Sequence, residues 1–307
     1  MSTLLLRFRE KTYAVVTDIE KTFLQIGLYE KDRDMTRFCW LTNTIGHTSE
    51  LIAYRFRAIL FGATCSPFIL NVTLLKHLHE NFSRTAELLK SGLYVDNIIS
   101  GFENASEFLE FYRVSHDLMN EGGFNLRSWA SICDELNNLT KLHNVNDRDE
   151  FVKVLGLRWN VKEDHVYFRY KPLPNLSENQ ITKREILRRA LSKIYDPLGM
   201  SSPVAVRSKI FLQDLWNRKL DWDEIIPQEI MTHWNKINQD MENCTKIKFS
   251  RRFFKSDTNE TGGPVLHVFA DASKVAYRGC AYLVKGNESA FVMAKNRVAP
   301  LKQLLQI

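Results

Sequence analysis

The stretch TDIEKTF, residues 17–23, decides the fold of this chain. It lies at the end of an apolar run that predicts a buried strand over residues 13–19. Asp18 in this stretch and Asp96 within YVDN (94–97) place carboxylates beside apolar segments. A carboxylate in such a position is costly unless it is paired or binds a cation. Two of them brought together would repel each other, and a divalent cation such as Mg²⁺ resolves that repulsion.

Apolar patterns and turn residues outline the remaining elements. Ser66 followed by Pro67 predicts a helix start, because Ser caps helices and Pro suits the first helical position. Thr182 followed by Glu185 predicts another start through a capping box. The sequence predicts strands over 35–41, 54–60, 151–159, 165–170, 265–271, 279–284 and 290–294, a short strand pair over 93–99, helices over 66–79, 106–120 and 229–241, helices beginning at 182 and 202, and linkers at 171–174 and 257–263.

Composition excludes several classes of protein. The chain has 307 residues, of which 44% are hydrophobic and 25% charged, as is typical of globular proteins. No apolar run approaches the roughly 18 residues of a membrane helix. Arg7 ends the apolar run at the N-terminus, so we expect no signal peptide. The five widely spaced cysteines include no C-x-x-C pair, which argues against disulfides and zinc and favours a reducing, cytoplasmic or nuclear location.

Several motifs occur in an order that resembles reverse transcriptases. TDIEKTF, FGATCSP (61–67) and YVDN are similar to their motifs A, B and C, and GGFNLRSW (122–129) and LGLRW (155–159) are similar to the next two blocks. The flanking sequence resembles polyproteins of the Pao/BEL class of LTR retrotransposons. Each motif alone is weak, but together they cover nearly the whole chain. The flanking segments are DRDMTRFCW (32–40), TKREILRRALSKIYDPLGMSSPV (182–204), KIFLQDLWNRKLDWDE (209–224) and LHVFADASKVAY (266–277).

The resemblance implies an α+β fold with three regions. Residues 1–170 are expected to form a reverse-transcriptase palm, an antiparallel sheet with helices, that lacks most of the fingers. Residues 171–262 are expected to form a helical region similar to a thumb or connection. Residues 263–307 are expected to form part of an α/β RNase H-like domain. The chain then corresponds to a middle section of a longer polyprotein, truncated at both ends.

The resemblance also implies a polymerase site. Asp18 and Asp96 are the expected ligands of Mg²⁺, with Mn²⁺ as an alternative. The metal ions are expected to stabilise the attack of a primer 3′-OH on a deoxynucleotide. The other implied roles are Phe23 as the steric gate that crowds a ribose 2′-OH, Gly62 and Ser66 as walls of the template and nucleotide pocket, and Tyr94 as a contact near the primer end.

Asn97 departs from the family pattern, which has a second Asp at this catalytic position. An amide has the same shape but no charge, so it is a weaker metal ligand. The loss of a carboxylate from a two-metal site removes charge stabilisation on the order of several kcal/mol. Whether the chain is an active enzyme therefore stays open. It is either an RNA-directed DNA polymerase fragment with reduced activity or a non-enzymatic remnant that binds nucleic acid or has no function.

Asp271, within VFADAS, is the expected first metal ligand of an RNase H site. Such a site needs further carboxylates, and no later segment of the sequence matches the next acidic motif. We therefore expect no RNase H activity.

One segment of the sequence is strongly basic and is a candidate binding site for a polyanion such as nucleic acid. Residues 182–219 contain nine basic and three acidic residues, a net charge of +6 that equals the formal net charge of the whole chain. In a reverse-transcriptase-like chain this region follows the primer–template, so we expect an RNA/DNA partner. The expected contacts to the nucleic-acid backbone are Arg184, Arg188, Arg189, Lys193, Arg207 and Lys209.

Overall fold

The structure is a computed structural model that describes residues 1–42, 49–147, 149–168, 181–192, 195–255 and 262–300. The chain forms two compact units. One unit is Thr12–Arg148, and the other combines Met1–Lys11 with Asp149–Ile307. The sequence predicted three regions, 1–170, 171–262 and 263–307. These regions were assigned by function and not by compactness, and they stay predictions. The expected linker at 171–174 and most of the one at 257–263 lie outside the described residues.

The first unit contains a four-stranded antiparallel sheet with strand order β4-β5-β1-β6. β1 is central, and its side chains Ala14, Val15 and Val16 are buried, as the apolar run predicts. The strand pair expected over 93–99 is present as β4 and β5. The bounds are β1 Tyr13–Ile19, β4 Leu93–Tyr94, β5 Asn97–Phe102 and β6 Leu126–Ser131.

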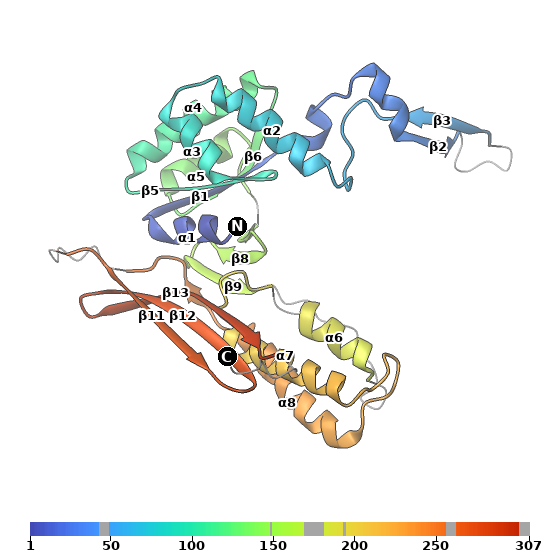
Figure 1. Cartoon of the computed structure of the whole chain (residues 1–307). Coiled ribbons are helices and arrows are strands. Elements are labelled where there is room, and N and C mark those ends of the chain that lie inside the picture. The colour runs from blue at the N-terminus through green and yellow to red at the C-terminus, as the bar shows by residue number, and fades with distance from the viewer. Residues whose placement is uncertain (43–48, 148, 169–180, 193–194, 256–261, 301–307) are drawn as a thin grey trace, which may run out of the picture. The chain divides into compact units, whose positions relative to one another are not determined.

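Four helices share a hydrophobic core with this sheet. α3 and α4 lie against β5, and α5 lies against β6 (Figure 1). α2 begins at Ser66, where a helix start was predicted, but its N-cap residue is Cys65, and the Ser66 hydroxyl donates to the carbonyl oxygen of Leu60 instead of capping the helix. α4 agrees with the helix expected over 106–120. α3 and α5 have no counterpart among the predicted elements, because nine residues give too short an apolar pattern. The bounds are α2 Ser66–His79, α3 Arg84–Gly92, α4 Ala105–Glu121 and α5 Asp134–Leu142.

The segment between β1 and α2 forms two 3₁₀ helices and a two-stranded hairpin, β2–β3. The second strand of the hairpin ends at Arg55 and does not extend over the expected 54–60. It ends there because the Phe56 amide donates to the Thr36 hydroxyl at 3.0 Å. The chain then turns to pair Ala58 with Gly27. The bounds are η1 Thr22–Gln25, η2 Glu30–Thr36, β2 Arg37–Leu41 and β3 Leu51–Arg55.

The second unit begins with a helix, α1, and a four-stranded antiparallel sheet of order β10-β9-β8-β7. The single strand expected over 151–159 is a hairpin. Leu155 and Gly156 have φ values of 46° and 92°, which close a two-residue turn of the kind that joins antiparallel strands. The bounds are α1 Ser2–Glu10, β7 Phe151–Val154, β8 Leu157–Asn160, β9 His165–Phe168 and β10 Phe249–Ser250.

A buried arginine fastens α1 to the rest of the second unit. Arg251 is fully buried and donates to both carboxylate oxygens of Asp164, at 2.6 and 2.9 Å. Its Nη1 donates to the carbonyl oxygens of Phe8 and Lys11, each at 2.8 Å. Arg9 in turn donates to the carbonyl oxygen of Arg251 at 3.0 Å. The N-terminal helix, which no sequence pattern predicted, therefore belongs to the unit formed by the C-terminal half.

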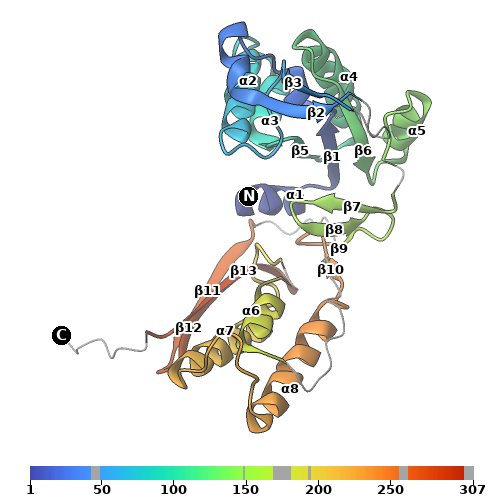
Figure 2. The same cartoon turned by 90° about the vertical axis from the view of Figure 1, so that its right-hand side faces the viewer.

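Three helices and a three-stranded antiparallel sheet complete the second unit. α6, α7 and α8 share a core that contains Ile186, Leu215 and Trp234. Thr182 accepts a hydrogen bond from the Glu185 amide at 3.4 Å, in agreement with the predicted helix start. α7 lies against β13 (Figures 1 and 2). No helix in the described ranges is long and apolar enough to cross a membrane. The bounds are α6 Lys183–Ser192, α7 Ser202–Asn217, α8 Gln228–Cys244, β11 Val265–Ala272, β12 Ala276–Lys285 and β13 Glu288–Val298.

Candidate active site

The pairing of β1 with β5 brings the three expected catalytic residues together. Asp18 lies directly opposite Asn97 in the antiparallel register. The amide of Ile19 donates to the carbonyl oxygen of Asp96 at 2.8 Å. Two motifs that are far apart in the sequence therefore meet where β1 ends.

The turn between β4 and β5 holds Asp96 on a strained backbone. Tyr94 and Asn97 pair across the hairpin and leave Val95 and Asp96 as its two-residue loop. Val95 has a φ of 57°. A β-branched residue in this region costs on the order of 1–3 kcal/mol, and such strain persists where the surrounding structure enforces it, often at functional sites. Tyr94, the residue expected near the primer end, is half-buried beside this turn.

The Asp18 carboxyl group has a raised pKa. Burial first, and the neighbouring charge of Asp96 second, raise the pKa of Asp18 to about 6. The charge of Asp147 adds a smaller upward effect on this pKa. The amide of Asp147 donates to the carbonyl oxygen of Trp129 in β6 at 2.9 Å. Asp147 lies in no sequence motif. Its effect on the pKa of Asp18 becomes apparent only from the pairing of its segment with β6.

Asn97 interacts with Asp96 through a hydrogen bond and not through charge. Its Nδ2 donates to Asp96 Oδ1 at 2.7 Å. An amide nitrogen is a donor and cannot bind a cation. The site therefore offers the two carboxylates of Asp18 and Asp96, with an amide where the family has a third.

The carboxylates of Asp18 and Asp96 fit a divalent cation. Burial first, and the charge of Asp96 second, disfavour the charged form of Asp18 and raise its pKa, and a cation bound to both carboxylates would offset these effects. Mg²⁺ in proteins is commonly held by one or two carboxylates together with substrate phosphates. Among the described residues, no group of three or more His, Cys, Asp or Glu side chains could hold a metal ion. Ligands beyond the two carboxylates would therefore come from oxygens outside this set of side chains, such as substrate phosphates and water.

The residues expected to shape the nucleotide pocket lie near one another. The rings of Phe23 and Phe61 meet edge to face, with centroids 4.9 Å apart. Ser66 Oγ donates to the carbonyl oxygen of Leu60 at 2.6 Å, which closes the loop that leads into α2. Gly62 in this loop has a φ of +84° and open space around the position of a side chain. Phe23 is thereby linked to the loop before α2.

Glu20 holds the segment between Asp18 and Phe23 in place, a role that no sequence motif predicts. Its carboxylate accepts hydrogen bonds from Asn125 Nδ2 at 2.9 Å and from Arg127 Nη1 at 2.6 Å. These bonds hold the pKa of Glu20 below its usual range. They tie the chain that follows β1 to the start of β6.

The basic residues expected to contact nucleic acid are partly engaged with carboxylates. Arg184 donates to both oxygens of Asp223, at 2.7 and 2.9 Å. Arg207 forms an ion pair with Asp240. The charge of the basic segment is thus partly balanced by acids that follow it in the sequence. Of the other expected contacts, Lys209 donates to Asn296 at 2.8 Å, Arg188 is exposed, and the side chains of Arg189 and Lys193 lie outside the described residues.

Asp271 lies in β11 opposite Arg278. Its carboxylate is 3.8 Å from the guanidinium group of Arg278, and both side chains are exposed. Within the part of the chain that the structure describes, it belongs to no potential metal-binding group. The structure therefore adds no further ligand to the expected RNase H position.

Known structures similar to this chain in fold include a reverse transcriptase. Residues 182–307 match the family model of the Pao retrotransposon-like RNaseH-like domain. Structures of a foamy viral protease–reverse transcriptase are similar in fold, with TM-scores of 0.51 for its complex with RNA/DNA hybrid, 0.53 for its complex with dsDNA and 0.54 for a dRH form with ds DNA. Each is 14% identical and covers 97% of this chain. No curated protein sequence matches the chain.

These similarities show which fold the chain has. The chain has the mixed fold of a retroviral reverse transcriptase, with antiparallel sheets and an RNase H-like region toward its C-terminal end. The expected α+β class is confirmed. The chain spans 35%, 53% and 45% of the length of the three similar structures.

Proposed function

We propose that the chain is a fragment of an RNA-directed DNA polymerase from a Pao/BEL-type retroelement, with the palm in residues 1–170 and weak polymerase activity. One observation carries this proposal. β1 and β5 place Asp18 opposite Asn97 and beside Asp96, which lies in a strained two-residue turn. The family match over residues 182–307 supports a retroelement origin.

The proposed reaction is the attack of a primer 3′-OH on the α-phosphate of a deoxynucleotide, with release of pyrophosphate. Asp18 and Asp96 hold Mg²⁺, or Mn²⁺ in its place. A bound metal ion supplies positive charge to the phosphate oxygens of the transition state. Phe23 excludes a ribose 2′-OH by its bulk, and Tyr94 supports the primer end.

Asn97 is the proposed reason for weak activity. Its amide places a donor on Asp96 Oδ1, an oxygen that a metal ion needs. The site also lacks the negative charge that a second aspartate would contribute. Both effects weaken metal binding, and metal-bound charge is the main source of catalysis in this type of reaction.

The proposed partner is an RNA/DNA primer–template. The similar foamy viral structures are complexes with an RNA/DNA hybrid or dsDNA. In this chain, Arg188 and Lys209 contact phosphates, and Arg184 and Arg207 exchange their carboxylate partners for phosphates. Other segments of a retrotransposon polyprotein are further proposed partners.

A non-enzymatic role in nucleic-acid binding is the second candidate function. The hydrogen bond from Asn97 to Asp96 favours it, because this bond occupies a metal-binding oxygen in the absence of substrate. Under this alternative the chain binds the hybrid and does not extend a primer.

Primer extension distinguishes the two functions. The purified chain, Asp18→Asn, Asn97→Asp and the double variant are assayed on an RNA template with Mg²⁺ and with Mn²⁺. We expect slow extension by the parent chain, none by Asp18→Asn, and a rate increase on the order of tenfold or more in Asn97→Asp. Asp117→Asn, which removes an exposed carboxylate on α4, is the matched control.

Two results would count against the polymerase. Extension that is unaffected by Asp18→Asn would place the chemistry elsewhere. Hybrid binding without extension, in both the parent chain and Asn97→Asp, would support the non-enzymatic function.

A further inference from the structure

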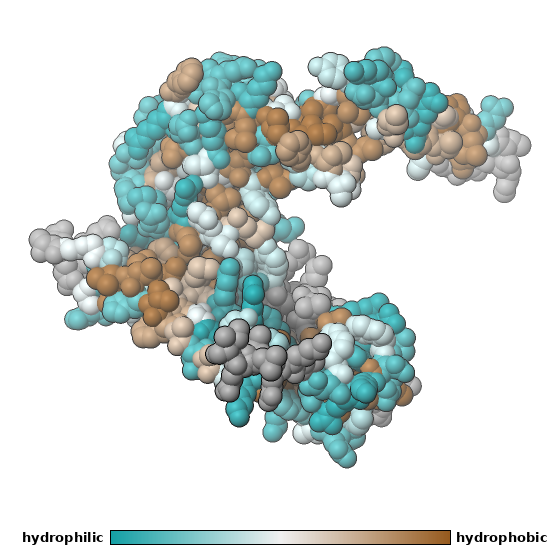
Figure 3. All heavy atoms as spheres, in the orientation of Figure 1, coloured by the Kyte–Doolittle hydropathy of each residue, from teal (hydrophilic) through white to brown (hydrophobic). Residues whose placement is uncertain are grey.

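A cavity of about 530 Å³ lies in the second unit, between one face of the β11-β12-β13 sheet and the segment that leads into α7. The two walls are held close together. An added Cβ at Gly199 would lie 1.9 Å from the carbonyl oxygen of Ala294, so only glycine allows this approach. Asn296 Nδ2 donates to the carbonyl oxygen of Ser202 at 3.2 Å. Apolar side chains lie at the surface of the sheet (Figure 3), and the volume falls within the roughly 300–1,000 Å³ of sites for small ligands.

The strand register sets side chains in rows across the floor of this cavity, because alternate residues of a strand share one face. The first row is polar. The row beside it has one ring and two small side chains, which leave space above them. An acid, a base and a ring therefore border the same open space. The two rows are Asp271, Arg278 and Asn296, and Phe269, Cys280 and Ala294.

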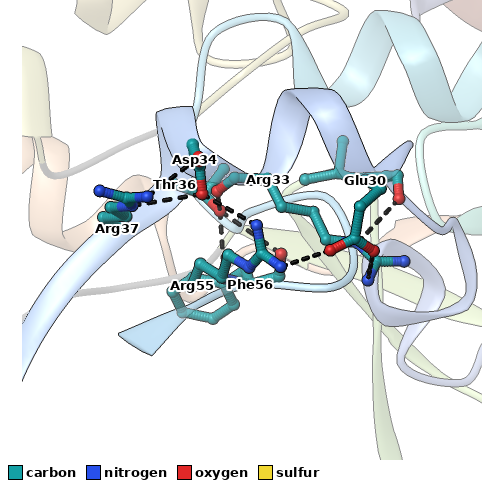
Figure 4. A network of polar contacts seen from close by, with 8 residues as sticks. Glu30, Arg33, Asp34, Thr36, Arg37, Arg55 and Phe56 are labelled. Atoms are coloured by element: carbon teal, nitrogen blue, oxygen red, sulfur yellow. Dashed lines mark hydrogen bonds and ion pairs between the residues drawn. The ribbon is translucent and has the colours of Figure 1, made fainter. Parts of the chain in front are cut away.

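The acid and the base of the polar row are only loosely paired. The Asp271 carboxylate lies 3.8 Å from the Arg278 guanidinium group, and the side chains are 73% and 65% exposed. In the β2–β3 hairpin of the first unit, by contrast, Asp34 binds Arg37 and Arg55 at 2.9 Å each (Figure 4). Asp271 has no second polar partner in the described part of the chain. An exposed pair contributes little to stability, so both groups can turn to a ligand at low cost.

We propose that this cavity binds a guanine base. A guanidinium group presents two parallel donors, and a carboxylate presents two acceptors. Guanine carries the acceptors N7 and O6 and, directly beside them, the donors N1–H and N2–H, so it forms two hydrogen bonds with Arg278 and two with Asp271. Each of the other bases presents a single donor position beside its acceptors, so one carboxylate oxygen would lose water without gaining a partner.

Phe269 supplies the stacking surface for the base. It is 57% exposed and lies two residues before Asp271 on the same face of β11. Tyr282, in the next strand, meets its ring edge to face with centroids 6.2 Å apart, so the Phe269 ring is held from one side. Exposed rings on which bases stack are a common means of binding single strands. The inference is independent of the polymerase proposal, since every residue of the cavity lies in the second unit.

Isothermal titration calorimetry of the full chain with GMP and AMP tests the proposal. Both nucleotides carry the same phosphate, so the difference between their affinities reports recognition of the base. Titration without divalent ions keeps the proposed metal site of the first unit out of the measurement. We expect GMP to bind at least about tenfold more tightly than AMP, in line with the discrimination that paired hydrogen bonds give.

Substitutions in the cavity should change this preference in distinct ways. Asp271→Asn replaces one acceptor by a donor, which suits adenine better than guanine, so the preference for GMP should be lost. Phe269→Ala should weaken binding of both nucleotides by about tenfold, because both bases lose the stacking surface. Val268→Ala, 68% exposed on the opposite face of β11, and Glu229→Gln, an exposed acid on α8, are matched controls and should change neither affinity.

A guanine base reaches the cavity either as a free nucleotide or as an unpaired base of a nucleic-acid strand. A short oligothymidylate with a central guanine, compared with one that has a central adenine, distinguishes these sources. A guanine preference in the oligonucleotide identifies the strand, and a preference with GMP alone identifies the free nucleotide. Circular dichroism checks that each variant is folded. Absent binding of GMP, equal binding of GMP and AMP, a preference that survives Asp271→Asn, or equal losses in Phe269→Ala and Val268→Ala would overturn the proposal.

Discussion

At the scale of single residues, Asp18 occupies a position in the candidate site that lowers the stability of the folded protein. A carboxylate that is partly buried beside Asp96 is destabilised when it is charged. A backbone hydrogen bond from Ile19 offsets part of this cost, but burial and the charge of Asp96 outweigh it, so the pKa of Asp18 stays raised. The charged carboxylate lowers the stability of the metal-free protein, and a bound cation would offset this cost. Such a residue is typical of a binding site rather than of a structural ion pair.

The stability of the metal-free protein should therefore depend on Asp18 and on pH. The pKa rises from 3.8 in the unfolded chain to about 6 in the folded one, so the folded state binds more protons between these values. Stability consequently falls as pH rises through this window, and the full cost is present above it. Asp18→Asn should raise the free energy of unfolding by about 1–2 kcal/mol near pH 7.5, a figure reduced for partial solvent screening.

Urea denaturation without divalent ions, near pH 4.5 and near pH 7.5, measures this effect. The gain from Asp18→Asn should shrink toward the acidic end. Asp117→Asn is the control for a general change in charge. A variant less stable than the parent chain near pH 7.5 would show that the Asp18 carboxylate makes a stabilising contact instead.

Gly62 offers a second test at the residue scale. An added Cβ would meet no atom within 4 Å at either Gly62 or Gly27, but only Gly62 has a left-handed backbone, with φ +84°. Gly62→Ala should therefore destabilise the protein by about 1 kcal/mol through backbone strain alone. Gly27→Ala should be neutral or slightly stabilising. Urea denaturation measures both, and equal effects would show that the loop before α2 adapts without strain.

At the scale of elements, the attachment of α1 depends on one buried side chain. Arg251 contacts the carbonyl oxygens of Phe8 and Lys11 and both oxygens of Asp164, so it joins three separate segments. Phe8 also packs edge to face on Trp159, with ring centroids 5.0 Å apart. α1 ends at Glu10, and β1 starts shortly afterwards at Tyr13.

Removal of the Arg251 guanidinium should release this helix. Arg251→Met removes a fully buried guanidinium group and leaves the partly buried Asp164 with the Trp159 Nε1–H as a donor, so the cost should be about 2–3 kcal/mol, less than for a fully buried pair. Hydrogen exchange of the α1 amides should become faster, together with exchange in β8 and β9. The double variant Arg251→Met/Asp164→Asn should recover part of the loss, because no unpaired charge remains. Arg218→Met, which removes an exposed ion pair with Asp214, is the control and should leave α1 exchange unchanged.

Local signals predicted the elements that carry them. Ser66-Pro67 fixed the start of α2, and Thr182 with Glu185 fixed that of α6. The turn at Leu155-Gly156 was missed, because a non-glycine residue with positive φ leaves no clear sequence signature. Asp18 and Asp96, which the order of the motifs singled out, lie close together in the structure, and their role as metal ligands stays a prediction. Asp147 could not be predicted, since its effect on Asp18 depends on a backbone bond to Trp129 that no nearby residue encodes.

At the scale of the whole molecule, the net charge of +6 is less concentrated in the folded chain than it is along the sequence. Residues 182–219 alone account for this sum. In the folded chain, however, Arg184 and Arg207 meet Asp223 and Asp240, which lie outside that segment. The basic segment is therefore a partly balanced surface. A polyanion must compete with these carboxylates, so binding should be weaker than the charge count alone suggests.

Removal of the competing carboxylates should strengthen binding to an RNA/DNA hybrid. Asp223→Asn and Asp240→Asn each free one arginine for phosphate contact, so affinity should rise about threefold and the salt dependence should steepen by about one ion per variant. Asp214→Asn adds the same charge but frees Arg218, which is not among the expected contacts, so its effect should be smaller. Fluorescence anisotropy with a labelled hybrid at low and moderate salt measures both quantities. An equal rise in all three variants would mean that only net charge matters, and affinity that is flat with salt would show that the basic segment does not contact the phosphates.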